Sequence, residues 1–581
     1  MRRALLAAAL VSLVAAGAAS AKPLRALKDS CRARTSPDGA AYRICAAKVA
    51  SFDGTPLDVT LTLPAHPAKH KLPLVAFLHG FLADKTEYLS HTKAGASSYK
   101  TVHWNNIWFA SRGYAVLNYS HRGHGDSGGQ IELASRDYEV RDAQFLTGRL
   151  ADAGASLARI DPRRIGVIGS SYGGGMAWML MTTRRSPSLE YGTWRSPHGR
   201  LLKLAAVVPT YTWTDLLYSL VPNGRHRVSG HLRQAARNPT GIAKQTLLDG
   251  FLATAGARLP QQVYAWLTRV NAGEPYDEPV DPLIQEAKRA LTNDRSAYYQ
   301  GGYFDALRAH RVRRVPVLAG QGWTDPIFPP IEALRMYTRL RRASHGYPIQ
   351  LYFGDFEHLT ALAKIPDLAR LHALGNRLLD HYLRGLGRRP RFDVRAAVTS
   401  CDPKVFGPVV RARRWGGLAK RRLAFTFTAS KQTVSKLTPD PFADPVIVSQ
   451  ANGRGCIKGD DGSTPGAAYY ALSLPAGTTL MGLPRLTIRY MSTAPDFELN
   501  SRLWDVSPSG VRTLVTRGVY RGGPSLGPAT ITYEMFGNAW RVRRGHHLEL
   551  ELLQDDSTFL RPDNIASTVT IRRVDVALPV H

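Results

Sequence analysis

The run Ile165-Gly166-Val167-Ile168-Gly169-Ser170-Ser171-Tyr172-Gly173 decides how the rest of the chain is interpreted. Its start, Ile165–Ile168, is short and apolar, which is typical of a buried strand. The segment Tyr172–Met181 that follows has a helical pattern. Glycines on both sides of Ser171 let the backbone turn sharply without a side-chain clash. The sequence therefore predicts a strand, a tight turn at Ser171 and a helix.

Around this turn, short apolar runs alternate with helical segments from Leu72 to about Tyr382. Strands without polar alternation are typical of a parallel sheet that helices cover on both faces. An alternating hairpin, Lys48–Leu63, turns at Asp53-Gly54 and suits an antiparallel sheet edge. The predicted strands are Leu74–Leu78, Ala115–Tyr119, Ile165–Ile168, Ala205–Val208, Val315–Leu318 and Ile349–Phe353. The predicted helices are Trp104–Ser111, Tyr138–Leu150, Tyr172–Met181, Ile331–Leu340 and Leu368–Tyr382.

Two regions depart from this alternation. Between Tyr211 and about Ala309, helical segments rich in Trp, Tyr and Leu predict an insertion that caps the sheet. After Pro390, alternating runs such as Arg485–Tyr490 and Thr568–Ile571 are separated by Gly, Pro and Asp turns, which favours a β-sandwich or jelly roll. We therefore predict a signal peptide (1–21), an N-terminal extension (22–45), an α/β catalytic domain (46–390, cap about 211–309) and a C-terminal β-sandwich (391–581).

The serine at the turn predicts nucleophilic chemistry. A Gly-x-Ser-x-Gly turn between strand and helix exposes the serine hydroxyl above the sheet. The hydroxyl needs an adjacent base, and in the α/β-hydrolase fold the order along the chain is Ser, then Asp or Glu, then His. Asp325 follows the strand Val315–Leu318, and His358 follows Ile349–Phe353. The sequence therefore predicts Ser171 as nucleophile, His358 as base and Asp325 as the residue that orients the base.

Other residues compete for these roles. Asp325 is also placed to cap the helix Ile331–Leu340, and His358 to make an ordinary loop hydrogen bond. Asp355 and Glu357 are alternatives to Asp325, but they are too close to His358 in sequence to reach its Nδ1 easily. His91 and His103 precede the nucleophile. His121 and His124 lie in a glycine-rich loop that is better interpreted as structural.

Backbone N–H groups are expected to stabilise the oxyanion of the reaction. In this fold the donors are the residue after the nucleophile and a residue in the loop after an earlier strand. Here these are Tyr172 and Phe81, and Phe81 follows His79-Gly80 after Leu74–Leu78. The chemistry requires no metal and no organic cofactor.

The N-terminus and the cysteines predict export. Arg2 and Arg3 precede an apolar run from Ala4 to Ala19, and small residues up to Ala21 suit a signal peptidase. An even number of cysteines in such a chain favours disulfides. Local pairing, Cys31 with Cys45 and Cys401 with Cys456, is the most economical of three connectivities, and four reduced thiols are the alternative. A secreted or cell-envelope location is expected, with no transmembrane segment in the mature chain.

The net charge of +31 bears on which kinds of partner the protein can bind. It favours electrostatic association with an anionic cell envelope. Nucleic-acid binding would require clustered basic residues with stacking aromatics, whereas here the arginines are scattered. The expected partner is a small acyl ester, amide or peptide substrate.

With its predicted cap and C-terminal β domain, the chain resembles the X-Pro dipeptidyl-peptidase and cocaine-esterase-like serine hydrolases. The resemblance covers about Ala46 to Val580. In the β domain, Gly482-Leu483-Pro484, Leu503-Trp504-Asp505-Val506 and Gly518-Val519-Tyr520-Arg521 are similar to the family's jelly-roll pattern. The family also includes α-amino-acid ester hydrolases and glutaryl acylases, so peptide, ester and amide substrates all remain open.

One departure concerns the oxyanion donor. Many members carry Arg-Thr-Pro-Tyr after the third strand, and its tyrosine hydroxyl is the donor. This chain has His79-Gly80-Phe81-Leu82 instead, and Tyr88 is not assigned that role. A dipeptidyl peptidase also requires carboxylates that bind the substrate's free α-amino group, and the candidates in the cap are Asp215, Glu274, Asp277 and Glu278.

The sequence thus predicts a secreted serine hydrolase that forms an acyl-enzyme and resembles X-Pro dipeptidyl-peptidases. One alternative is a carboxylesterase or acylase without peptidase activity. Another is an envelope polysaccharide-binding protein with a vestigial hydrolase core. Candidates for an aromatic substrate pocket are Trp213, Tyr218, Trp266, Tyr299 and Trp323.

Overall fold

The computed structural model describes residues 24–581 except 67–69, 96–100, 229–238, 277–279, 357, 360–363, 453–454, 460–463 and 524–525. The signal peptide predicted at 1–21 lies outside the described residues, as do Asp277, Glu278 and Glu357. In the described part, no helix is both long enough and apolar enough to cross a membrane.

A twelve-stranded sheet forms the larger part of the molecule, in the order β1-β2-β3-β5-β4-β6-β8-β9-β10-β11-β12, with β7 paired to β8. The strands from β5 through β4 and β6 to β11 run parallel, whereas both ends of the sheet are antiparallel. Their bounds are β1 Arg32–Thr35, β2 Ala41–Ala50, β3 Pro56–Pro64, β4 Leu72–Leu78, β5 Ala115–Tyr119, β6 Ile160–Ser170, β7 Thr193–Arg195, β8 Leu201–Thr210, β9 Val317–Gly322, β10 Ile349–Gly354, β11 Val394–Ala397 and β12 Val409–Ala412.

The parallel strands are apolar without alternation because each faces two cores. β4 sends Leu74, Ala76 and Leu78 into one core, and Val75 and Phe77 into another on the opposite face. Helices α3, α4 and α10 contribute to the first core, and α2 and α11 to the second. Helix bounds outside the cap are α1 Arg25–Asp29, α2 Asn106–Ser111, α3 Glu139–Ala153, α4 Tyr172–Thr182, α10 Ile331–Ala343 and α11 Ile365–Leu379.

The sheet extends past both predicted limits of the catalytic domain. β1 and half of β2 come from the N-terminal extension, and β11 and β12 lie beyond residue 390. β11 pairs in parallel with β10, so the sheet continues to Ala412. β11 and β12 have only four residues each, too few to show a clear pattern in the sequence.

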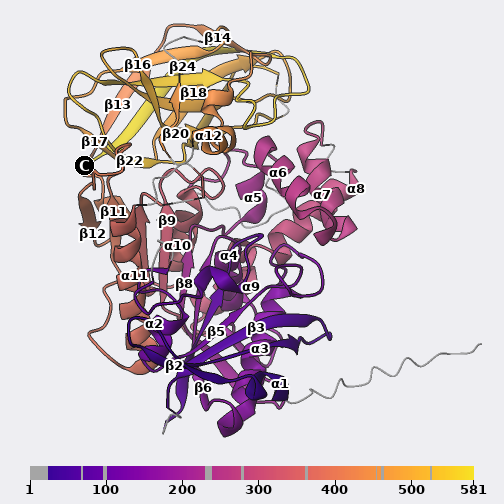
Figure 1. Cartoon of the computed structure of the whole chain (residues 1–581). Helices are drawn as coiled ribbons and strands as arrows, with labels where there is room; N and C mark the ends of the chain where they lie inside the picture. The colour runs from indigo at the N-terminus through magenta and orange to yellow at the C-terminus, as the bar shows by residue number, and fades with distance from the viewer. Residues whose placement is uncertain are drawn as a thin grey trace, which may run out of the picture.

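The cap contains helices α5 Leu216–Leu220, α6 Gln245–Ala255, α7 Gln261–Asn271, α8 Pro282–Arg289 and α9 Gly301–Arg308. The C-terminal region forms two antiparallel sheets of seven and five strands. It stacks on the α/β part, and helices α5 to α8 lie beside the junction (Figure 1). The strands are β13 Arg421–Phe427, β14 Lys431–Val434, β15 Lys458–Gly459, β16 Ala468–Leu472, β17 Thr479–Gly482, β18 Arg485–Ser492, β19 Asn500–Val506, β20 Arg512–Gly518, β21 Ala529–Glu534, β22 Asn538–Arg541, β23 His547–Leu553 and β24 Thr568–Val580.

One helix in this β region, α12 (Pro445–Asn452), was not expected. Its β-branched run favours a strand by composition. The Asp444 carboxylate accepts hydrogen bonds from the N–H groups of Val446 and Ile447, and Pro445 occupies the first turn. These hydrogen bonds and the proline start the helix. α12 lies on the side of the sandwich that faces the helices of the cap (Figure 1).

Two disulfides each join cysteines that follow one another along the chain. Cys31 is bonded to Cys45, and Cys401 to Cys456, at sequence separations of 14 and 55 residues. Both bonds follow the predicted local pairing. The second links the segment after β11 to the segment after α12.

Candidate active site

Ser171 lies on a strained turn between β6 and α4. Its φ of 52° is unusual for a residue with a side chain. The turn is closed by the Ser171 N–H, which donates to Thr210 O, and by the Gly173 N–H, which donates to His79 O. A Cβ on Gly173 would lie 2.1 Å from the Leu78 carbonyl oxygen. Glycine is therefore required where α4 passes β4, as the sequence motif predicts.

Asp325 and His358 come together at the ends of β9 and β10. His358 Nδ1 lies 2.9 Å from Asp325 Oδ2, and the Asp325 side chain is fully buried. Asp325 Oδ1 accepts hydrogen bonds from the N–H groups of Ile327 and Phe328. His358 Nε2 is buried without a hydrogen-bond partner among the described residues. The geometry leaves Nε2 available to take a proton from a neighbouring hydroxyl.

The competing residues have other contacts. Asp355 lies 3.2 Å from Lys364 Nζ in a buried ion pair. His103 stacks on Trp108, and His91 is exposed on the surface. Of the carboxylates considered as the partner of His358, Asp325 is the one that contacts it in the described part of the chain.

The loop after β4 places the Phe81 amide beside the serine turn. A Cβ on Gly80 would lie 3.8 Å from the Ser171 Cβ. The Gly80 carbonyl oxygen is 2.7 Å from His79 Nδ1 and accepts a hydrogen bond from the Ala83 N–H. Because the Gly80 C=O and the Phe81 N–H belong to one planar peptide unit, these bonds set the direction of the Phe81 N–H. Tyr88 contacts Ser170 instead, so its hydroxyl lies behind the turn.

Three neutral histidines support this loop. Burial lowers the pKa of His79 to about 4 and that of His124 to about 3, and it lowers the pKa of His121 well below its usual range. His79 Nε2 accepts a hydrogen bond from the His121 N–H, and the rings of His79 and His121 stack at 3.8 Å. His79 Nδ1 therefore carries the proton that is donated to Gly80 O. This arrangement agrees with the structural role predicted for the loop of His121 and His124.

Ser171 and His358 line one cavity of about 360 Å³. Its volume is in the range of small-molecule sites. The wall comes from the serine turn, the cap and α12 of the β region. The described lining residues are Phe81, Leu82, Leu133, Ser171, Tyr172, Trp213, Leu216, Leu220, Thr246, Leu247, Gly250, Phe251, Thr254, Leu259, Leu267, Ile327, Phe328, His358, Leu359, Val446 and Gln450.

Of the five aromatic residues predicted for a substrate pocket, the described lining of this cavity includes Trp213 alone. Tyr218 is buried under the Arg335 guanidinium, and Trp266 lies under that of Arg295. The Tyr299 hydroxyl donates to Asp215. Trp323 is buried, and its indole N–H donates to the Ala397 carbonyl. Aromatic content in the sequence does not separate packing residues from lining residues.

The two described carboxylates considered for binding a substrate amine are held elsewhere. Asp215 is fully buried, caps α5 and accepts hydrogen bonds from Tyr299 and the Tyr218 N–H. Glu274 accepts a hydrogen bond from the Asn564 N–H of the β region. Neither belongs to the described lining of the cavity. Asp277 and Glu278 lie outside the described residues.

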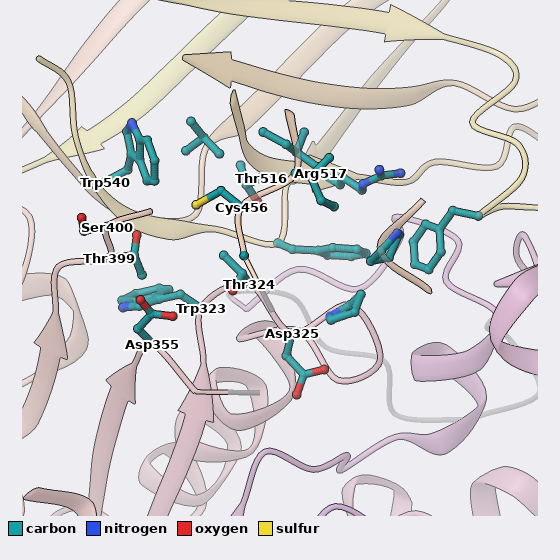
Figure 2. Close-up of a pocket in the computed structure, with 18 residues that line it drawn as sticks. Trp323, Thr324, Asp325, Asp355, Thr399, Ser400, Cys456, Thr516, Arg517 and Trp540 are labelled. Atoms are coloured by element: carbon teal, nitrogen blue, oxygen red, sulfur yellow. The ribbon is translucent and has the colours of Figure 1, made fainter. Parts of the chain in front are cut away.

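A second, smaller cavity of about 70 Å³ lies behind Asp325, between the sheet loops and the β region. Trp323 and Asp355 line it from the α/β part, and Trp540 and Arg517 from the β region (Figure 2). The Asp325 carboxylate points away from these β-region side chains (Figure 2). The β region therefore packs against the back of the turn that holds Asp325.

Lys244 is a site residue that the sequence did not single out. It is fully buried, and its Nζ donates hydrogen bonds to the carbonyl oxygens of Pro326 and Ile327, at 2.6 and 2.8 Å. Burial lowers the pKa of Lys244 to about 7. A single lysine before a cap helix has no distinguishing pattern in the sequence, because most lysines there are solvated.

Comparison with known proteins agrees with this architecture. The model of the X-Pro dipeptidyl-peptidase (S15) family matches residues 53–360. An α-amino acid ester hydrolase structure is similar with a TM-score of 0.59 and 16% identity, covering 93% of this chain and 97% of that chain. An aminopeptidase from a marine sediment Thaumarchaeota archaeon is similar with a TM-score of 0.61 and 14% identity, covering 95% and 96%. A CocE/NonD family hydrolase from Staphylococcus aureus is similar with a TM-score of 0.56 and 13% identity, covering 95% and 97%. These likenesses confirm the predicted fold class.

Proposed function

Because this chain belongs to the X-Pro dipeptidyl-peptidase (S15) family of hydrolases, we propose that it is a secreted serine hydrolase that transfers an acyl group to water. One observation carries the proposal. Ser171, on its strained turn, shares a cavity with His358, whose Nδ1 is held by the buried Asp325. A serine, a base and an orienting carboxylate are the parts that acyl transfer requires.

The reaction has two halves. The Ser171 hydroxyl attacks the substrate carbonyl while His358 Nε2 takes its proton and passes it to the leaving group. Water then attacks the acyl-enzyme while His358 Nε2 takes a proton from it, and His358 gives this proton to the Ser171 oxygen as the bond to the acyl group breaks. Asp325 keeps the Nδ1–H tautomer and stabilises the imidazolium that forms. The N–H groups of Phe81 and Tyr172 hold the oxyanion in both halves.

Secretion is supported by the two disulfides and by the leader pattern of the sequence. Disulfides persist in oxidising compartments outside the cytosol. We propose that the mature protein begins near Lys22, and that its net charge of +31 favours contact with an anionic envelope.

Labelling with a fluorophosphonate probe tests the proposal. The mature wild type and a Ser170→Ala control should be labelled, and peptide mapping should locate the label on Ser171. Ser171→Ala should not be labelled and should lose turnover of p-nitrophenyl acetate. If the wild type is neither labelled nor active on any acyl substrate, the catalytic proposal fails. Binding of cell-wall polymer by both proteins would then favour the polysaccharide-binding alternative.

The same proteins separate peptidase from esterase. Cleavage of Gly-Pro or Ala-Pro p-nitroanilide that depends on Ser171 would establish X-Pro dipeptidyl-peptidase activity. Ester turnover without anilide cleavage would establish a carboxylesterase or acylase.

A further inference from the structure

We propose that the acyl group this enzyme accepts is large, apolar and uncharged, with medium-chain aliphatic acyl groups as its simplest form. The inference rests on the proposed function, because it assumes that Ser171 is the nucleophile. It goes further by naming the substrate class that the cavity around Ser171 fits.

The wall of the cavity carries no Asp, Glu, Lys or Arg among its described residues. Beside Ser171 and His358, its polar side chains are Tyr172, Thr246, Thr254 and Gln450, none of which is charged at neutral pH. The Tyr172 hydroxyl donates a hydrogen bond to Glu139 and is directed away from the cavity. The remaining wall is built mainly from leucine, phenylalanine and other apolar side chains.

The charged groups near the site already form hydrogen bonds within the protein. Lys244 donates to two backbone carbonyls, and Asp325 binds His358 and two backbone amides. Asp215 and Glu274, the described cap carboxylates considered for binding a substrate amine, accept hydrogen bonds from Tyr299 and Asn564. A substrate with a free α-amino group or a terminal carboxylate would find no described counter-charge in the cavity. Burying an unpaired charge costs free energy, so the cavity binds such substrates poorly.

Helix α6 forms the side of the cavity where a substitution can change the space available to substrate. Thr246, Gly250 and Thr254 follow one another at a spacing of four residues and line it together, as one face of a helix does. Gly250 is exposed, and a Cβ built on it meets no atom within 4 Å. Because Gly250 lines the cavity and its Cβ position is empty, a larger side chain there has room to extend into space available to the acyl group.

Ester hydrolysis by the wild type gives the first test. For p-nitrophenyl esters from acetate to decanoate, kcat/KM should rise up to about fourfold per added methylene, which corresponds to about 0.8 kcal/mol per buried CH₂. The 8-aminooctanoate ester and the suberate monoester should be hydrolysed about a hundredfold or more slowly than octanoate, because their charges enter an apolar wall. A flat chain-length profile, or equal rates for the charged esters, would overturn the inference.

A variant pair locates the effect in the cavity. Gly250→Trp should lower kcat/KM for octanoate at least about tenfold relative to acetate, because it removes space for several methylenes. Ala253→Trp adds the same side chain at an exposed position of α6 outside the described lining, and should leave the octanoate-to-acetate ratio unchanged. Equal ratios in the two variants would count against the inference.

The two proposals fail in different ways. Absence of fluorophosphonate labelling at Ser171 would remove the serine mechanism itself. Labelling at Ser171 together with a preference for Gly-Pro anilides or charged esters would leave the mechanism intact and overturn the apolar acyl group.

Discussion

Both carboxylate oxygens of Asp325 have defined partners. Oδ1 accepts two backbone N–H groups, and Oδ2 accepts the Nδ1–H of His358. The turn after β9 thus fixes the carboxylate, and the carboxylate fixes the imidazole. This chain of contacts determines which nitrogen of His358 carries the proton.

Asp325→Asn should therefore impair catalysis with little loss of stability. The amide oxygen can still accept the two backbone N–H groups, but the amide NH₂ would donate to Nδ1 and place the proton on Nε2. A protonated Nε2 cannot accept the Ser171 proton. We expect kcat on p-nitrophenyl acetate to fall about 10³- to 10⁴-fold, with Tm nearly unchanged. A decrease smaller than about tenfold would show that Asp325 does not orient His358.

Lys244 supports the same turn from the cap. Lys244→Met would leave the carbonyl oxygens of Pro326 and Ile327 buried without these donors. Each unsatisfied group costs about 1–3 kcal/mol, so the free energy of unfolding should fall by about 2–6 kcal/mol. Denaturant unfolding measures the loss. Lys404→Met, at an exposed lysine, should change stability by less than about 0.5 kcal/mol. Equal stabilities for the two variants would exclude the supporting role of Lys244.

At the level of helices and strands, the sequence predicted the central parallel sheet well and its edges poorly. β5 matches its prediction, β4, β6, β8 and β10 extend their predicted cores by one to seven residues, and β9 begins two residues later than predicted. Strands buried on both faces are continuous apolar runs, so they are visible in the sequence. β11, β12 and α12 were missed, because four-residue strands and a β-branched helix depend on tertiary contacts rather than on local pattern.

The sequence likewise predicts some residues of the candidate site better than others. The positions of Ser171, Asp325 and His358 follow from strand ends and chain order, both of which the sequence contains. The cavity wall instead joins residues that are far apart, such as Leu133, Phe251 and Gln450. No periodic pattern connects such residues, and the aromatic pocket predicted from composition therefore included one lining residue of five.

The disulfide Cys401–Cys456 closes a longer loop than Cys31–Cys45, and the chain-entropy model predicts that it stabilises more. The separations are 55 and 14 residues. The model gives about 4 and about 3 kcal/mol respectively. The double variant Cys401→Ser/Cys456→Ser should therefore unfold at a lower guanidinium concentration than Cys31→Ser/Cys45→Ser. The reverse order would show that native-state contacts of the first disulfide outweigh loop length.

Across the whole molecule, the cap and the β region meet at buried carboxyl groups. Asn564, next to Asp563, donates its N–H to Glu274 of the cap. Burial raises the pKa of Asp563 to about 8 and raises that of Glu498 well above its usual range. The nearby carboxylates of Glu274 and Asp496 raise the pKa of Asp563 further, whereas Arg521 opposes this shift. The junction therefore favours protonated carboxyl groups.

This junction should make the folded protein less stable as the pH rises. Because the folded-state pKa of Asp563 exceeds the unfolded value of 3.8, the folded state binds more protons between pH 4 and pH 8. The resulting stabilisation is complete below pH 4 and is lost as the pH rises through 8. Asp563→Asn keeps an acceptor for the Glu498 N–H and removes the charge, so its Tm should fall less between pH 5 and pH 8.5 than that of the wild type.

Asp402→Asn, at an exposed aspartate, is the control and should follow the wild-type profile. If Asp563→Asn also follows the wild-type profile, the junction does not titrate in this range.

The helix α12 has a consequence for how this enzyme can diverge. Val446 and Gln450 line the cavity from a region that contributes none of the proposed catalytic side chains. Mutations there can change which substrates are used while the reaction machinery stays intact. Selection for a different substrate and selection for the reaction itself therefore act on different residues of the protein. Among close homologues, positions 446 and 450 should vary with ecological niche while 171, 325 and 358 remain constant.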